Sequence, residues 1–95
     1  MNTVLKQAIT DLKMVKLRYQ GYLRVVEPHA YGRNKDGDEI LWCYQTSGGS
    51  KSVSTGWKLF KVREVFTPQL TNTTFQARHE YKRNHSAMIH TFAQI

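Results

Sequence analysis

Cysteine, proline and acidic side chains are all scarce in this chain of 95 residues. The single cysteine, Cys43, excludes an internal disulfide and any zinc site built from several cysteines. No apolar run approaches the roughly 18 residues that a membrane span needs, and residues 1–13 lack the features of a signal peptide. We therefore expect one small, soluble, cytoplasmic domain that makes no membrane contact.

Patterns typical of catalysis are also missing. The sequence holds no pair of acid–base carboxylates, no nucleophile elbow and no phosphate-binding loop. Cys43 falls within a predicted strand, where a buried and inert thiol is expected. His79, His85 and His90 lack the spacing of metal ligands. The sequence thus predicts no catalytic residue, no metal and no cofactor, and we do not expect an enzyme.

Positive charge is abundant and unevenly distributed. Fourteen Lys and Arg residues against seven Asp and Glu residues give a net charge of +7. Residues 1–47 hold seven basic and five acidic residues, a balance of +2, whereas residues 48–95 hold seven and two, a balance of +5. Such an excess is typical of polyanion binders, because each neutralised phosphate releases counterions. The alternative is that the charge serves solubility alone.

The apolar pattern changes from a helical period to a strand period near residue 14. The helical stripe, capped by Asn2 or Thr3, consists of Val4, Leu5, Ala8, Ile9 and Leu12. Strands are predicted at residues 14–20, 22–28, 39–46 and 57–66, with a Gly/Ser-rich loop at 47–56. The spacing of these strands predicts a mainly β domain, a small barrel or sandwich.

Two prolines and the C-terminal residues refine this expectation. Pro28 lacks an amide hydrogen, so the second strand should end or bulge there and aim His29 and Tyr31 toward a ligand mouth. Pro68 should close the β region. Residues 70–95 are expected to form an ordered extension that packs on the main unit, residues 1–69, and residues 86–93 fit either a helix or a strand. The expected core contains Leu17, Val25, Leu41, Leu59 and Val62.

Three stretches follow one another in a recognisable order: residues 17–21 (LRYQG), 24–28 (RVVEP) and 57–65 (WKLFKVREV). Their order and spacing resemble those of the WYL domain family, and the tail looks like that of its short stand-alone members. The resemblance implies a small α+β, mainly β fold: a five-stranded Sm-like barrel with an N-terminal helix. It also implies a ligand-sensing module of bacterial regulators, with nucleic acid or nucleotide-like ligands.

The sequence departs from the family pattern at several positions. The Trp-Tyr-Leu that names the family falls on residues 39–41 (EIL). Lys58 and Lys61 stand where the family carries ligand-contacting arginines, and a lysine lacks the planar fork of an arginine. No helix-turn-helix precedes the first strand, so we expect any DNA-reading domain on another chain.

The resemblance and the charge together predict a ligand surface on the second and closing strands. Basic side chains would hold a phosphodiester there, and aromatic rings would stack bases. The predicted ligand-binding residues are Tyr19, Arg24, His29, Tyr44, Trp57, Lys58, Lys61 and Arg63. A secondary basic cluster consists of Arg78, Lys82 and Arg83. The alternative is that the rings belong to the core and that the lysines form a solvated face.

Two functions from different classes remain open on the sequence. The first is a regulatory module that binds single-stranded RNA or DNA, or a nucleotide-like ligand, as an accessory factor in transcription or phage defence. The second is a protein–protein interaction module whose basic charge is incidental. A separate DNA-binding or nuclease protein and a second copy of the chain are the expected protein partners.

Overall fold

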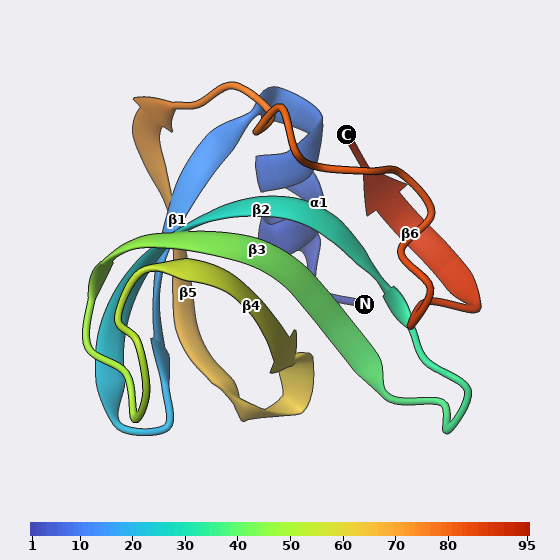
Figure 1. The fold of residues 1–95 in the computed structure, drawn as a ribbon, viewed down its shortest axis with the longest axis horizontal. Helices are drawn as coiled ribbons and strands as arrows, with labels where there is room; N and C mark the ends of the chain where they lie inside the picture. Colours follow the sequence, from blue (N-terminus) through green and yellow to red (C-terminus); the bar gives the residue numbers. More distant parts are fainter.

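The computed structural model describes residues 1–95, which form one α-helix, one short 3-10 helix and six strands (Figure 1). In chain order the elements are α1 (Thr3–Asp11), β1 (Lys13–Tyr19), β2 (Tyr22–Arg33), β3 (Glu39–Gly48), β4 (Gly56–Lys61), η1 (Val62–Glu64), β5 (Val65–Thr74) and β6 (His90–Gln94). The structure therefore confirms a mainly β domain with an N-terminal helix.

The helix forms where the apolar stripe predicts it. The Asn2 side chain accepts a hydrogen bond from the Leu5 amide at 3.1 Å, which satisfies one of the free donors at the helix N-terminus. Leu5, Ala8 and Ile9 are buried against the sheet. Leu12 ends the helix in the left-handed conformation. With nine residues, this helix is too short to cross a membrane, and the structure contains no longer one.

All six strands belong to one antiparallel sheet, and that sheet does not close. The strand order is β4-β3-β2-β1-β5, and β6 adds to the far end of β2. The terminal strands β4 and β5 are joined by η1 and share no ladder. The expected closed five-stranded barrel is corrected to an open six-stranded sheet, because β5 pairs only with β1 and the C-terminal residues contribute a sixth strand.

Pro28 introduces a bulge and does not end its strand. Pro28 pairs with Cys43 and Ala30 pairs with Trp42, so His29 is the bulged residue, which has no partner in β3. Beyond this bulge, β2 continues to Arg33. The prediction that the second strand ends or bulges at Pro28 is confirmed, since the strand bulges there. The prediction that Pro68 closes the β region is wrong, because β5 continues to Thr74.

The main core lies between α1 and one side of the sheet, which we call the inner face. Leu17 and Leu41 are fully buried there, as expected. Val25 and Val62 are only half-buried, and Leu59 is 44% exposed, so these three predictions fail in part or whole. The reason is register: Leu41 pairs with Phe60, which is 2% exposed, and alternation then turns Leu59 to the opposite side.

The C-terminal residues return across the sheet and end as a strand. Residues 86–93 contain no helix, and His90–Gln94 pair with β2 instead. Gly32 permits this pairing, because a Cβ at that position would lie 2.2 Å from the His90 carbonyl oxygen. β5 crosses the boundary expected between residues 69 and 70. The segment between β5 and β6, residues 75–89, is the C-terminal cover (orange in Figure 1).

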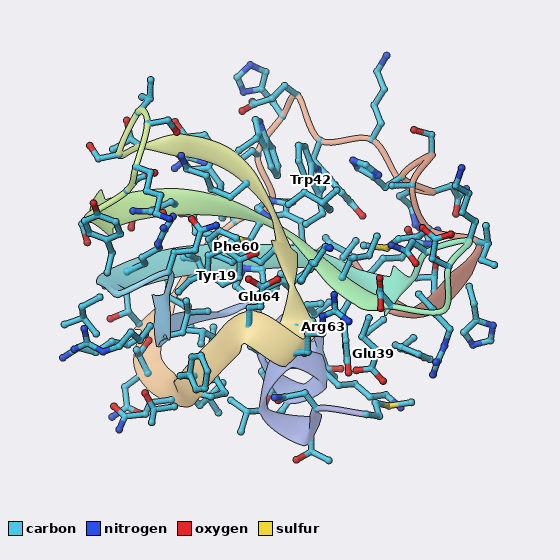
Figure 2. All side chains as sticks on the ribbon, turned by 90° about the horizontal axis from the view of Figure 1, so that it is seen from below. Tyr19, Glu39, Trp42, Phe60, Arg63 and Glu64 are labelled. Carbon is cyan, nitrogen blue, oxygen red and sulfur yellow. The ribbon has the colours of Figure 1, made fainter.

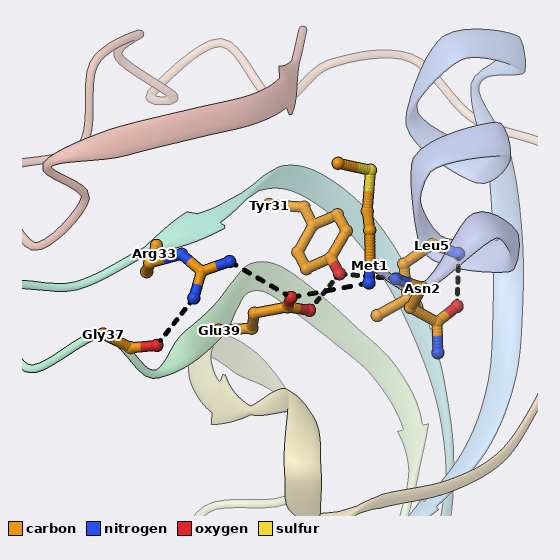
Figure 3. Close-up of polar contacts among 7 residues, drawn as sticks. All are labelled: Met1, Asn2, Leu5, Tyr31, Arg33, Gly37 and Glu39. Atoms are coloured by element: carbon orange, nitrogen blue, oxygen red, sulfur yellow. Dashed lines mark hydrogen bonds and ion pairs between the residues drawn. The ribbon is translucent and has the colours of Figure 1, made fainter.

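A polar network around the buried Tyr31 anchors the N-terminus beside β2 and β3 (Figure 3). The Tyr31 hydroxyl donates to the Glu39 carboxylate and accepts from the Asn2 amide at 2.6 Å. Burial raises the pKa of Tyr31 to about 12, so its hydroxyl keeps the proton that it donates. Glu39 also faces Arg33 and the Met1 ammonium group, each at 3.7 Å. Glu39 therefore has a structural role here.

Candidate functional site

A second aromatic layer lies on the outer face, the side of β2, β3 and β4 that points away from α1. Figure 2 shows Trp42 on the opposite side of these strands from Tyr19 and Phe60. Strand alternation places Tyr44 and Trp57 on the same side as Trp42, since Tyr44 pairs with Trp57 across β3 and β4. The C-terminal cover packs on this layer through Phe75, Tyr81 and His85. The outer face is thus an aromatic surface that the chain covers in part with its own C-terminal residues.

His29 occupies the middle of this layer. Its ring is fully buried and lies 4.8 Å from Trp57, 5.4 Å from Phe75 and 5.0 Å from Tyr81, measured between ring centres. The ring nitrogen Nε2 accepts the Arg78 amide at 3.1 Å, so in the neutral ring Nδ1 carries the hydrogen and donates to the Glu27 carbonyl at 2.8 Å. Burial lowers the pKa of His29, which favours this neutral form.

Arg78 fastens the C-terminal cover to the sheet. Its Nε donates to the Glu27 carboxylate at 2.8 Å, and its guanidinium carbon lies 3.5 Å from the centre of the Tyr44 ring. The hydrogen bond to Glu27 raises the pKa of Arg78 further above its usual value. Tyr44, a predicted ligand-binding residue, and Arg78, from the secondary basic cluster, therefore contact each other within the fold.

A pocket of about 350 Å³ opens between the outer face and the cover. Trp42 and Trp57 form its aromatic wall, with ring centres 4.9 Å apart and planes inclined by 7°. The rest of the lining comes from the consecutive residues Glu80, Tyr81, Lys82, Arg83, Asn84, His85 and Ser86. The pocket thus joins two stacked indoles to a polar, mostly basic segment of the chain.

The polar segment is held in place by contacts at both of its ends. Asn84, at φ 62°, exchanges hydrogen bonds with the Gln94 side chain at 2.9 and 3.0 Å, which ties the segment to β6. The His85 ring lies 4.5 Å from Trp42, and its Nδ1 accepts the Ala87 amide at 3.1 Å. The Tyr81 hydroxyl donates to the His29 carbonyl at 3.4 Å. These contacts hold the lining segment against the sheet.

Charged groups around the pocket remain accessible. Lys82 and Arg83 are exposed, and neither forms an ion pair within the structure. Glu80 is also exposed, and the pKa of its carboxyl is lowered, chiefly by a hydrogen bond from its own backbone amide and less by His79, Trp57 and Arg78. The pocket therefore presents two free cations and one ionised carboxylate beside the indoles.

Tyr19 and Arg24, both predicted to bind ligand, are buried on the inner face. Arg24 is 2% exposed, and its guanidinium carbon lies 5.2–5.5 Å from the centres of the Tyr19, Tyr22 and Phe60 rings. It donates to the Tyr19 carbonyl and to Gln45, and its Nη2 has no partner. Burial lowers the pKa of Arg24. Neither residue shares a surface with the pocket.

The three basic residues of the closing stretch also diverge. The Lys58 ammonium donates to Ser50 and to the Val53 carbonyl of the Gly/Ser loop. Lys61 is exposed at the end of β4, and Arg63 on η1 lies 3.6 Å from Asp38. Of the predicted residues, only Trp57 lines the pocket together with Lys82 and Arg83 from the secondary cluster.

Sequence reasoning missed Trp42 and His85. Trp42 and Tyr44 are two positions apart in β3, so the strand period of two could have placed their side chains on the same face. The missing information was the pairing of β3 with β4, which brings Trp42 opposite Leu59 and next to Trp57. His85 gives no such signal, because it lies in an irregular segment.

Comparison of this chain with protein-family models, with curated proteins and with solved structures finds no match. The function is therefore inferred from the pocket and the residues around it.

Proposed function

We propose that this protein is a binding module for single-stranded nucleic acid or a nucleotide-like ligand, and that the ligand binds in the pocket beside Trp42 and Trp57. The observation that carries this proposal is the combination of a stacked indole pair with the free cations of Lys82 and Arg83 in one cavity. The proposal keeps the predicted ligand class and replaces the predicted surface around Lys58 and Lys61.

The aromatic wall supplies the base-binding half of the site. Trp42 and Trp57 are each half-buried, so the pocket has an aromatic surface that a ligand can contact. Stacking of a base on an aromatic side chain contributes about 1–3 kcal/mol and tolerates any base, because every base has a π-face. The His29, Tyr44 and Tyr81 rings surround Trp57 and hold its indole in place.

The basic segment supplies the phosphate-binding half. Lys82 and Arg83 lie next to each other in sequence and line the same cavity as the two indoles. An arginine can contact a phosphate with two parallel hydrogen bonds, whereas a lysine acts as a point charge. A cavity of this volume is at the small end of ligand sites and fits one nucleotide of a strand, with neighbouring phosphates outside it.

We further propose that the chain is a short stand-alone relative of WYL domains with an Sm-like arrangement of β1 to β5. The N-terminal helix and the neighbour order β4-β3-β2-β1-β5 support this relationship. The proposed role is ligand sensing for a transcription or phage-defence partner on another chain. Cys43 is not an activated nucleophile, because its thiol is buried and burial raises its pKa.

Intrinsic fluorescence tests the proposal directly, because the chain has two tryptophans and both line the pocket. Titration with single strands of about eight nucleotides should quench this fluorescence, with weaker binding at about 200 mM than at about 50 mM salt. Replacing Lys82→Ala or Arg83→Ala should each lower the salt slope by about one. Trp42→Ala should weaken binding and leave the slope unchanged.

Lys35→Ala is the matched control, because Lys35 is an exposed lysine in the turn between β2 and β3, outside the pocket lining. This variant should bind as the unmodified protein does. If Lys58→Ala and Lys61→Ala lower the slope while Lys82→Ala and Arg83→Ala do not, the originally predicted surface is the binding site. Absence of any binding at low salt would refute the proposed function.

The free edge of β5 favours a second function, association with another protein. β5 pairs with β1 on one side only, and it exposes Phe66 by 61% and Leu70 by 40%. Unpaired strand edges with exposed apolar residues are templates for pairing with another chain. Light scattering should then detect a concentration-dependent dimer, and Phe66→Lys should abolish it while oligonucleotide binding is retained.

A further inference from the structure

Glu80 is the one charged residue of the pocket lining that phosphate binding does not explain. A carboxylate beside Lys82 and Arg83 repels a phosphate and would weaken a site that served only for anion binding. Its side chain is 42% exposed, His79 Nδ1 lies 3.3 Å from its Oε2, and its own backbone amide, His79, the Trp57 side chain and Arg78 lower the pKa of its carboxyl. An ionised carboxylate has about four acceptor positions, so it can still accept hydrogen bonds from a ligand.

Base edges differ in the donors that they offer to a carboxylate. The Watson–Crick edge of guanine places two donors side by side, the N1 hydrogen and the 2-amino group, which match the two oxygens of a carboxylate. Adenine and cytosine each offer one amino group beside an acceptor nitrogen, and uracil offers one N–H between two carbonyl oxygens. A carboxylate therefore forms a bidentate pair with guanine, while the other bases place an acceptor against one of its oxygens.

We propose that Glu80 makes this pocket selective for guanine: the base stacks on the Trp42–Trp57 wall, its N1 and 2-amino hydrogens donate to the Glu80 carboxylate, and Lys82 and Arg83 bind its phosphate. This inference rests on the proposed function and adds the identity of the base. Glu80, Lys82 and Arg83 all lie in the lining segment 80–86, so one short stretch of chain would bind both the base edge and the phosphate.

The rest of the pocket is consistent with this arrangement of donors and acceptors. With Nδ1 of His85 occupied by the Ala87 amide, the neutral ring has its hydrogen on Nε2, which is free to donate. Guanine has an acceptor oxygen, O6, next to its N1 hydrogen. The Asn84–Gln94 hydrogen bonds hold the segment that bears Glu80, Lys82 and Arg83, so its groups are positioned before the ligand binds.

The experiment compares GMP, IMP, AMP, CMP and UMP by tryptophan fluorescence titration at low salt. GMP should bind at least about tenfold more tightly than AMP, since a bidentate pair discriminates strongly between bases. IMP, which lacks the 2-amino group, should fall between them. A second series uses oligothymidine octamers with or without one central guanosine. A guanine preference found only in this series would show that the pocket binds guanine as part of a strand and not as a free nucleotide.

Glu80→Gln is the decisive variant, and the affinity ratio of GMP to AMP is its readout. Removing the carboxylate also removes its repulsion of phosphate. This change strengthens the binding of all nucleotides by the same factor, so it cancels in the affinity ratio of GMP to AMP. The ratio should fall below about threefold in Glu80→Gln and stay unchanged in Asp36→Asn, an exposed residue outside the pocket lining whose replacement makes the same change in charge. Circular dichroism of both variants checks that they are folded.

Equal binding of GMP and AMP, together with equal binding of the octamers with and without the central guanosine, would overturn the guanine inference and leave the proposed function intact. A guanine preference that persists in Glu80→Gln would also overturn it. If none of the nucleotides or strands binds, the proposed function itself fails, so the two failures are distinguishable.

Discussion

Arg78 gives the sharpest test of how the C-terminal cover is held on the sheet. Arg78→Ala removes a 2.8 Å hydrogen-bonded ion pair with Glu27 and a cation–π contact at 3.5 Å from Tyr44. The Arg78 side chain is 33% exposed and that of Glu27 is 11% exposed, so the ion pair is partly screened and contributes about 1 kcal/mol. The cation–π contact contributes about 1 kcal/mol more.

The expected loss is therefore about 2 kcal/mol of unfolding free energy, or about 8–16 °C in Tm for a domain of this size. Thermal unfolding followed by circular dichroism measures it. Arg83→Ala is the matched control, because Arg83 is exposed and unpaired, and it should change stability by less than about 0.5 kcal/mol. Combining Arg78→Ala with Glu27→Gln should be less than additive, since the two share one contact. Equal Tm values for Arg78→Ala and Arg83→Ala would refute this account of the cover.

Three further predictions concern the two layers of the fold. Burial lowers the pKa of His29 below the ordinary value of 6.5, so the unfolded chain takes up a proton first as the pH falls. The free energy of unfolding should therefore decrease below pH 6.5. Urea titrations of His29→Phe should lack that part of the pH dependence. Phe60→Ala should destabilise the domain by about 3–5 kcal/mol, and Leu59→Ala by less than about 1 kcal/mol, in the same urea titrations; the reverse order would contradict the register of β4. The Cys43 thiol should react with a thiol reagent only after denaturation, because it is buried and its pKa is raised; reaction with the native protein at the rate of a free thiol would contradict its burial.

Local patterns in the sequence were sufficient for the helix and for most strands. The stripe around Leu5 and Ile9 and the cap at Asn2 are encoded within a dozen residues, and the structure confirms both. The alternation of β1 around Leu17 is equally local. These elements depend on contacts between near neighbours, which explains why the pattern predicts them well.

Register and long-range pairing could not be predicted in the same way. The stretch Trp57–Lys61 contains Leu59 and Phe60 side by side, and either could face the core; the pairing of Phe60 with Leu41 decides it. A shift of one residue reverses every side chain of a strand, which is why the predicted core was wrong at Leu59. β6 depends on a partner about 60 residues away in β2, and no local signal announces it.

The site shows the same division between residue types and placement. The sequence identified Trp57, Lys82 and Arg83 as residues suited to a nucleic-acid ligand, and all three line the pocket. It grouped Trp57 with Lys58 and Lys61 because these residues lie in the stretch that resembles the closing motif of WYL domains. Strand alternation turns Lys58 to the opposite face from Trp57, and the C-terminal cover brings the distant basic segment to the tryptophans instead.

The most direct test of the central claim follows the two indole N–H signals in ¹H–¹⁵N spectra while a single-stranded octamer is added at low salt. The chain contains two tryptophans, so Trp42 and Trp57 account for all indole signals. If the pocket binds nucleic acid, both signals should shift together with the backbone amides of residues 80–86, and the amides of Lys58 and Lys61 should stay in place. Shifts confined to Lys58, Lys61 and Arg63, or the absence of any shift in the indole signals, would contradict the proposed site.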